Sequence, residues 1–134
     1  VADVAQQVDR LDGKLLANTR ESAIAAYLDG WKRRIERVGT LNFPNEARRR
    51  QLSGNPVLEV AIRANGTLES VVVRRTSGHR ELDNAAVGIV RLAAPFEPFP
   101  SALRERYPVL RFAYEWQFIN GQLGGAGAVF SSGP

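Results

Sequence analysis

The most constraining feature of this sequence is the order of patterns between Leu58 and Phe99. Two alternating segments flank Asn65-Gly66, an amphipathic helix follows Thr76-Ser77-Gly78, and prolines from Pro95 onward end that helix. A β-hairpin followed by a helical crossover packs its helix on one face of a small sheet. The sequence therefore predicts an α+β fold.

A third strand is expected from Val109 to Ile119, where the alternation is clearest. Its apolar face carries five large residues: Leu110, Phe112, Tyr114, Trp116 and Phe118. The helical crossover returns this strand antiparallel to the first strand of the hairpin, so the simplest sheet order is 2-1-3. The last strand then lies at an edge with an unpaired row of backbone N–H and C=O groups. Such an edge is a template for β-augmentation.

The register of the hairpin stays open at this point. A two-residue turn at Asn65-Gly66 pairs Val60 with Val71, whereas a one-residue bulge at Gly66 turns Leu68 inward.

Two helices are expected before the hairpin, which gives the order α-α-β-β-α-β. An apolar stripe from Ile24 to Val38 predicts a helix that Asn18 caps and Gly39 ends, and Pro44 opens a shorter one. The expected organisation is an N-terminal helical or linker segment at 1–19, one domain at 20–120 and a flexible Gly/Ser-rich tail at 121–134. The first segment has a helical stripe of its own: Val4, Val8, Leu11 and Leu15.

Composition argues against an enzyme and against a metal or cofactor site. The chain has no cysteine and a single histidine, His79, which excludes thiolate metal sites and two-histidine metal sites. Ser77 is two residues from His79, but this spacing is more typical of a loop at a helix start than of a nucleophile and its base. A phosphate-binding loop is followed by a helix, but no helix is expected after the glycine-rich stretch at 124–127.

The formal net charge of +4 raises an alternative function, binding of nucleic acid. The basic residues cluster at Lys32-Arg33-Arg34 with Arg37, and at Arg48-Arg49-Arg50. A solvated helix face is the more ordinary explanation of both clusters. The expectation is that nucleic acid is not the partner.

Several of these motifs together resemble the TonB C-terminal domain family over about residues 20 to 120. The resemblance depends on their order along the chain: Phe43-Pro44-x-x-Ala47, the hairpin with Asn65-Gly66, Thr76-Ser77-Gly78, Leu82-Asp83-x-Ala85-Ala86, Pro95-Phe96-x-Pro98-Phe99 and the aromatic last strand. The helix ahead of Phe43-Pro44 is similar to that of TonB-like energy transducers of Gram-negative bacteria.

This resemblance implies a periplasmic domain. A proline-rich linker and an N-terminal helix, neither of them in this sequence, would tether it to the inner membrane, where a proton-channel complex of the ExbB/ExbD type would drive it. The domain would bind the Ton box of a TonB-dependent outer-membrane transporter by strand addition and transmit proton-motive-force energy for uptake. The implied binding residues are those of the last strand: Val109, Leu110, Arg111, Phe112, Ala113, Tyr114, Glu115, Trp116, Gln117 and Phe118.

The resemblance also implies contact with the transporter plug at Phe43-Pro44, where the family has tyrosine-proline. Phenylalanine removes a hydroxyl donor at this position. Glu46 stands where some members have arginine, so Arg48 is the expected cation. A homodimer that exchanges strands at the free edge is a further partner that the family permits. A bridging domain of the TolA type, with a similar helix-plus-three-strand plan, is the alternative within the same class.

Overall fold

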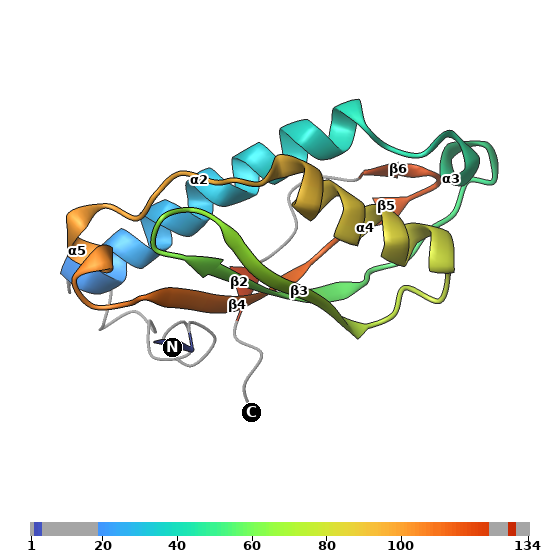
Figure 1. The fold of residues 1–134 in the computed structure, drawn as a ribbon. Helices are drawn as coiled ribbons and strands as arrows, with labels where there is room; N and C mark the ends of the chain where they lie inside the picture. Colours follow the sequence, from blue (N-terminus) through green and yellow to red (C-terminus); the bar gives the residue numbers. More distant parts are fainter. Residues whose placement is uncertain (1, 4–18, 124–128, 131–134) are drawn as a thin grey trace.

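Two long helices cover one face of a β-sheet in the computed structural model (Figure 1). The structure describes residues 2–3, 19–123 and 129–130. Its helices are α2 (Thr19–Leu41), α3 (Asn45–Arg49), α4 (Arg80–Ala93) and α5 (Ser101–Arg104). Its strands are β1 (Ala2–Asp3), β2 (Val57–Arg63), β3 (Leu68–Arg75), β4 (Val109–Glu115), β5 (Phe118–Ile119), β6 (Gln122–Leu123) and β7 (Val129–Phe130).

The three long strands confirm the predicted sheet. Strand β2 is central and antiparallel to both β3 and β4, which is the expected order 2-1-3. The crossover through α4 connects β3 to β4, as the length of that connection requires.

The expectation that the last long strand is a free edge needs correction. On the side of β4 away from β2, β1 pairs in parallel with Leu110 and Arg111, and β7 pairs antiparallel with Ala113 and Tyr114. Exposed backbone N–H and C=O groups of an edge accept any strand within reach, including one from the same chain. Part of the sequence expected to form terminal segments thus covers part of this edge.

The hairpin combines the two registers that the sequence left open. Val60 pairs with Val71, but a shift between Ala61 and Ile62 also brings Leu68 opposite Ile62. The turn is a three-residue loop, in which the Gly66 N–H donates to the Arg63 carbonyl and Gly66 has a φ of 92°. A glycine in the left-handed region allows this turn and its bulge.

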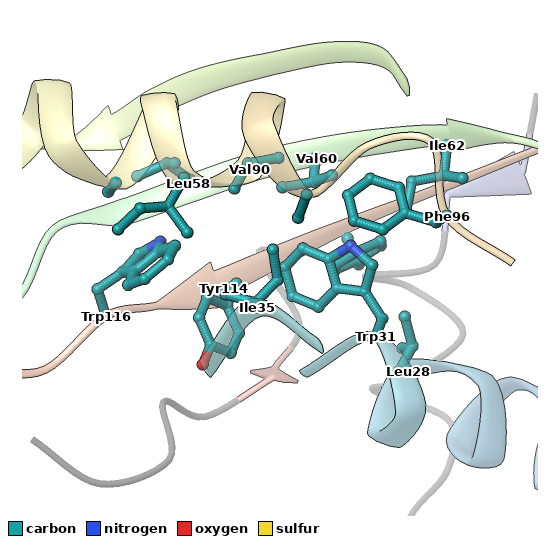
Figure 2. Close-up of a cluster of buried hydrophobic side chains, with 14 of the residues drawn as sticks. Leu28, Trp31, Ile35, Leu58, Val60, Ile62, Val90, Phe96, Tyr114 and Trp116 are labelled. Carbon is teal, nitrogen blue, oxygen red and sulfur yellow. The ribbon is translucent and has the colours of Figure 1, made fainter. Parts of the chain in front are cut away.

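The core lies between the two helices and the sheet, and Trp31 of α2 is at its centre (Figure 2). The indole meets Phe112 and Tyr114 of β4 edge-on, with ring centroids 4.8 and 5.1 Å apart. Ile35, one turn along α2, is fully buried, and so is Val90, which α4 contributes to the same core. The inward aromatic face of β4 is therefore packed against helices, as its alternation predicted.

Helix α2 does not end at Gly39 but continues to Leu41. A Cβ at Gly39 would come within 2.9 Å of Leu123, so this glycine permits close packing of β6 on the helix. The predicted Asn18 cap and the stripe of Val4, Val8, Leu11 and Leu15 lie outside the described residues.

The aromatic strand expected as far as Ile119 is interrupted after Glu115. Phe118 and Ile119 form β5, which turns back into β6 through Asn120-Gly121. Both turn residues have positive φ, 50° and 76°, as a type I′ turn requires. An Asn-Gly hairpin therefore occupies the start of the segment expected to be a tail.

Gly66→Ala should destabilise the domain by about 3 kcal/mol, which combines left-handed strain with steric overlap. A Cβ at Gly66 would lie 2.1 Å from the carbonyl oxygen of Phe96, whose own N–H donates to Gly66. Chemical denaturation measures the loss.

Gly78→Ala is the matched control for this variant. Gly78 has a φ of 93°, but nothing lies within 4 Å of a Cβ there, so strain alone should cost about 1 kcal/mol. Equal losses in the two variants would contradict the role assigned to the Phe96 contact.

Candidate functional site

Two backbone hydrogen bonds establish which residues of β4 face its neighbour β2. The N–H of Ala64 donates to Pro108 and the N–H of Trp116 donates to Pro56, each at 2.9 Å. Antiparallel strands exchange such bonds at alternate residues, and the pairing of β2 with β4 has no register shift. The even-numbered residues of β4 therefore bond to β2.

The odd-numbered residues of β4 direct their backbone groups to the outer edge: Val109, Arg111, Ala113 and Glu115. Their side chains lie on the face of the sheet away from the helices, since the even-numbered ones are in the core. Arg111 reaches Glu69 of β3 at 3.4 Å, and Glu115 reaches Arg75 at 2.6 Å. Both side chains extend across β2, away from the outer edge.

Within the described part of the chain, strands β1 and β7 cover only part of this edge. Each is two residues long, and they face Leu110, Arg111, Ala113 and Tyr114. A pairing of two residues provides few backbone hydrogen bonds, so a longer incoming strand has more to gain from the same edge.

The opposite edge of the sheet, at β3, is a poorer template for strand addition. The pairing of β3 with β2 shifts twice, between Val57 and Leu58 and between Ala61 and Ile62. Bulges are one means by which proteins protect an edge, whereas the pairing of β4 with β2 is regular along its length.

The predicted binding residues of the last strand fall into two groups: odd-numbered residues, whose backbone groups in β4 face the outer edge, and even-numbered residues, whose side chains are buried. Leu110, Phe112 and Tyr114 are buried in the core, so only their neighbours contribute backbone groups to the outer edge. Trp116 and Phe118 are also buried, and Phe118 exchanges backbone hydrogen bonds with Gly54. The half-buried Gln117 lies between β4 and β5.

The rings of Tyr114, Trp116 and Phe118 follow one another as an aromatic row, and Phe43 and Arg48 lie together at its Phe118 end. The Phe43 ring centroid is 5.3 Å from that of Phe118, and the Arg48 guanidinium carbon is 5.9 Å from the Phe43 centroid. Pro44 begins α3 at its N-cap and thereby directs Arg48 back toward Phe43. The structure thus brings the expected plug-contacting residues next to the end of the aromatic row.

A cavity of about 240 Å³ opens beside this pair of residues. It is lined by Thr40, Phe43, Arg48, Gln122 and Leu123. Sequence reasoning missed Gln122 and Leu123, although Asn120-Gly121 between two short apolar segments signals the hairpin that brings them there.

The sequence is similar to that of a known protein family. The family described as Gram-negative bacterial TonB protein C-terminal matches residues 40–116, more than half of the 134 residues. The chain belongs to the TonB C-terminal domain family. It is also 30% identical, over 80 residues, to Protein TonB of Pasteurella multocida (strain Pm70), and the match covers 60% of this chain and 30% of that protein. The chain thus spans less than a third of this curated relative, and no solved structure matches it.

The region matched to the TonB family includes the whole of β4 and the Phe43-Pro44 motif, but it ends before the β5–β6 hairpin.

Within the described part of the chain, no helix is long and apolar enough to cross a membrane. The same residues contain no group of three or more histidine, cysteine, aspartate or glutamate side chains placed to hold a metal ion.

The Thr76-Ser77-Gly78 motif of this TonB-family domain is the start of α4. The Ser77 hydroxyl donates to the carbonyl of His79 at 2.8 Å and accepts from the His79 N–H, so its bonds are to backbone atoms and not to the imidazole. Asp83 accepts from the Ser77 N–H at 2.8 Å and from the Thr76 hydroxyl. These contacts fit a helix-start role for the motif.

The same bonds lower the pKa of Asp83. Burial alone would raise this pKa, but the hydrogen bonds from Thr76 and Ser77 outweigh burial and bring it below its ordinary value of 3.8. A carboxylate with a lowered pKa stabilises the folded state above its ordinary pKa and loses this contribution as the pH falls through the folded value.

Asp83→Ala should therefore lower the unfolding free energy at pH 7 by about 1 kcal/mol, the typical net worth of such a hydrogen bond. The difference from the unaltered protein should shrink as the pH falls below 3.8. Chemical denaturation at pH 7 and at a pH below 3.8 measures the two differences. Asn84→Ala, on the exposed side of α4, is the control. A difference that is independent of pH would contradict it.

Proposed function

We propose that this TonB-family domain binds the Ton box of a TonB-dependent outer-membrane transporter by adding it as a strand to the outer edge of β4. The observation that supports this proposal is the row of outward backbone groups at Val109, Arg111, Ala113 and Glu115 along a strand of regular register. Main-chain pairing gives affinity that depends little on the peptide sequence.

The second contact in this proposal is with the plug of the transporter, at the cavity lined by Phe43 and Arg48. An exposed guanidinium at its rim suits a plug carboxylate, and the Phe43 ring offers an apolar surface beside it. The cavity adjoins Phe118, so one transporter can contact both places at once.

The proposed role is periplasmic energy transduction. An N-terminal anchor outside this sequence would connect the domain to an ExbB/ExbD-type proton-channel complex in the inner membrane. A strand that is pulled along its length loads several backbone hydrogen bonds together, so an added strand suits the transmission of force. The domain itself performs no chemical step in this scheme.

Arg111→Pro should weaken binding of a Ton box peptide about tenfold or more, because proline removes an outward N–H and places its ring on the edge. The bonds to β2 are kept, since Arg111 does not bond to that strand. Fluorescence anisotropy with a labelled peptide measures the affinity, and circular dichroism checks the fold.

Arg111→Ala is the matched control, because it loses the same side chain and the same contact with Glu69 but keeps the N–H. It should bind as the unaltered domain does. Equal affinities for the proline and alanine variants would reject strand addition at this edge.

Removal of residues 124–134 should strengthen peptide binding severalfold, because β7 no longer occupies the outer edge of β4 beside Ala113 and Tyr114. The apparent dissociation constant rises when the binding-competent state is only part of the population, and the truncation removes one competing state. A synthetic peptide of residues 124–134 should reverse the gain in a competition titration. An unchanged affinity would show that β7 does not compete with the Ton box.

A further inference from the structure

A second cavity, of about 270 Å³, opens between α2 and the segment that follows α4. In Figure 1 this segment runs beside α2 toward α5. The lining residues are Ala26, Tyr27, Gly30, Trp31, Arg34, Arg37, Phe96 and Glu97. None of them belongs to the β4 edge or to the cavity at Phe43.

The aromatic walls of this cavity are held in place by other contacts. The Tyr27 hydroxyl donates to the Glu97 carbonyl at 2.7 Å, and its ring meets Phe99 edge-on at 5.1 Å. The Trp31 indole lies beside the Phe96 ring, with centroids 6.0 Å apart (Figure 2). Burial, and then the charge of Glu97, raise the pKa of Tyr27 far above its ordinary value, so the phenol keeps its proton as a donor. The cavity is therefore preformed.

Two guanidinium groups give the cavity its charge. Arg34 Nε donates to the carbonyl of Ala93 at the end of α4 at 2.7 Å, which orients the guanidinium and leaves its two Nη groups without a protein acceptor among the described residues. Arg37, one turn along the helix, forms no ion pair within that part of the chain, whereas Arg33 is paired with Asp29. A guanidinium group matches the geometry of a carboxylate, and that of Arg34 is already oriented by its bond to Ala93.

The size and lining of the cavity define the class of ligand. Its volume is below the range of roughly 300–1,000 Å³ that is usual for small-molecule sites, so it fits one or two side chains better than a cofactor. The aromatic walls call for an apolar group next to the anion. Glu97, the one carboxylate among the lining residues, disfavours a doubly charged phosphate more than a singly charged carboxylate.

We propose that this cavity binds a short acidic segment of a protein partner. The carboxylate of that segment lies between Arg34 and Arg37, and an adjacent apolar side chain packs against Trp31 and Phe96. This site is separate from the strand-adding edge of β4, so either can fail in experiment without the other.

A tripeptide tests this proposal directly: acetyl-Leu-Glu-Leu-amide, against acetyl-Leu-Gln-Leu-amide, which differs only in charge. Titration of the labelled domain should shift the indole N–H signal of Trp31, which lines the cavity, and leave that of Trp116 unchanged. Both indole nitrogens are buried without a hydrogen-bond partner in the described structure, so they are matched reporters. The glutamine peptide should bind at least tenfold more weakly.

Gly30→Leu should abolish this binding without harm to the fold. Nothing lies within 4 Å of a Cβ at Gly30, so the new side chain enters open space, and leucine suits a helix better than glycine. Gly88→Leu is the matched control, because a Cβ at this exposed position of α4 is also free of contacts. It should leave binding unchanged.

Arg37→Gln supplies a second variant, since this exposed side chain has no structural partner among the described residues. It should weaken the glutamate peptide severalfold and reduce the salt dependence of binding. Equal binding of the two peptides, or binding that Gly30→Leu does not affect, would overturn the proposal. Displacement of the peptide by inorganic phosphate at a lower concentration would assign the site to a phosphate group instead, which also overturns it.

Discussion

The contact of Trp31 with the inward rings of β4 determines what the rest of this domain can offer a partner. The indole is 3% exposed and meets Phe112 and Tyr114 edge-on, so the side of β4 richest in side-chain chemistry is used to attach α2 to the sheet. What remains at β4 is mainly its outer row of backbone groups. The proposed recognition by main-chain pairing rests on this use of the aromatic residues.

The two edges of the sheet differ in regularity, and this difference is the reason why the proposed partner strand is placed at β4 and not at β3. Along β3, two register shifts in the pairing with β2 oppose the addition of a strand. Along β4 the pairing with β2 is uninterrupted, and the charged side chains Arg111 and Glu115 extend over the sheet to β3. Among the residues that the structure describes, the short strands β1 and β7 are what protects this edge.

Local patterns were sufficient to predict the sheet order and the inward face of β4. The connection length between Arg75 and Val109 and the alternation of aromatic residues fix both. The occupied edge was not predictable, because the pairing of Ala2 with Leu110 joins residues distant in sequence and leaves no periodicity to detect. The hairpin at Asn120-Gly121 was predictable from its turn residues, but the glycine-rich sequence after it suggested a tail.

The outer edge of β4 carries a parallel strand near its start, at Leu110, and an antiparallel one near its end, at Tyr114. Its hydrogen-bonding groups thus accept either polarity, and the backbone alone does not tell a peptide which way to run. Orientation must come from something asymmetric along the strand, and the cluster of Phe43, Arg48 and Phe118 stands at one end only. In the proposed transmission of force, this cluster would therefore determine which end of the bound peptide bears the pulling force.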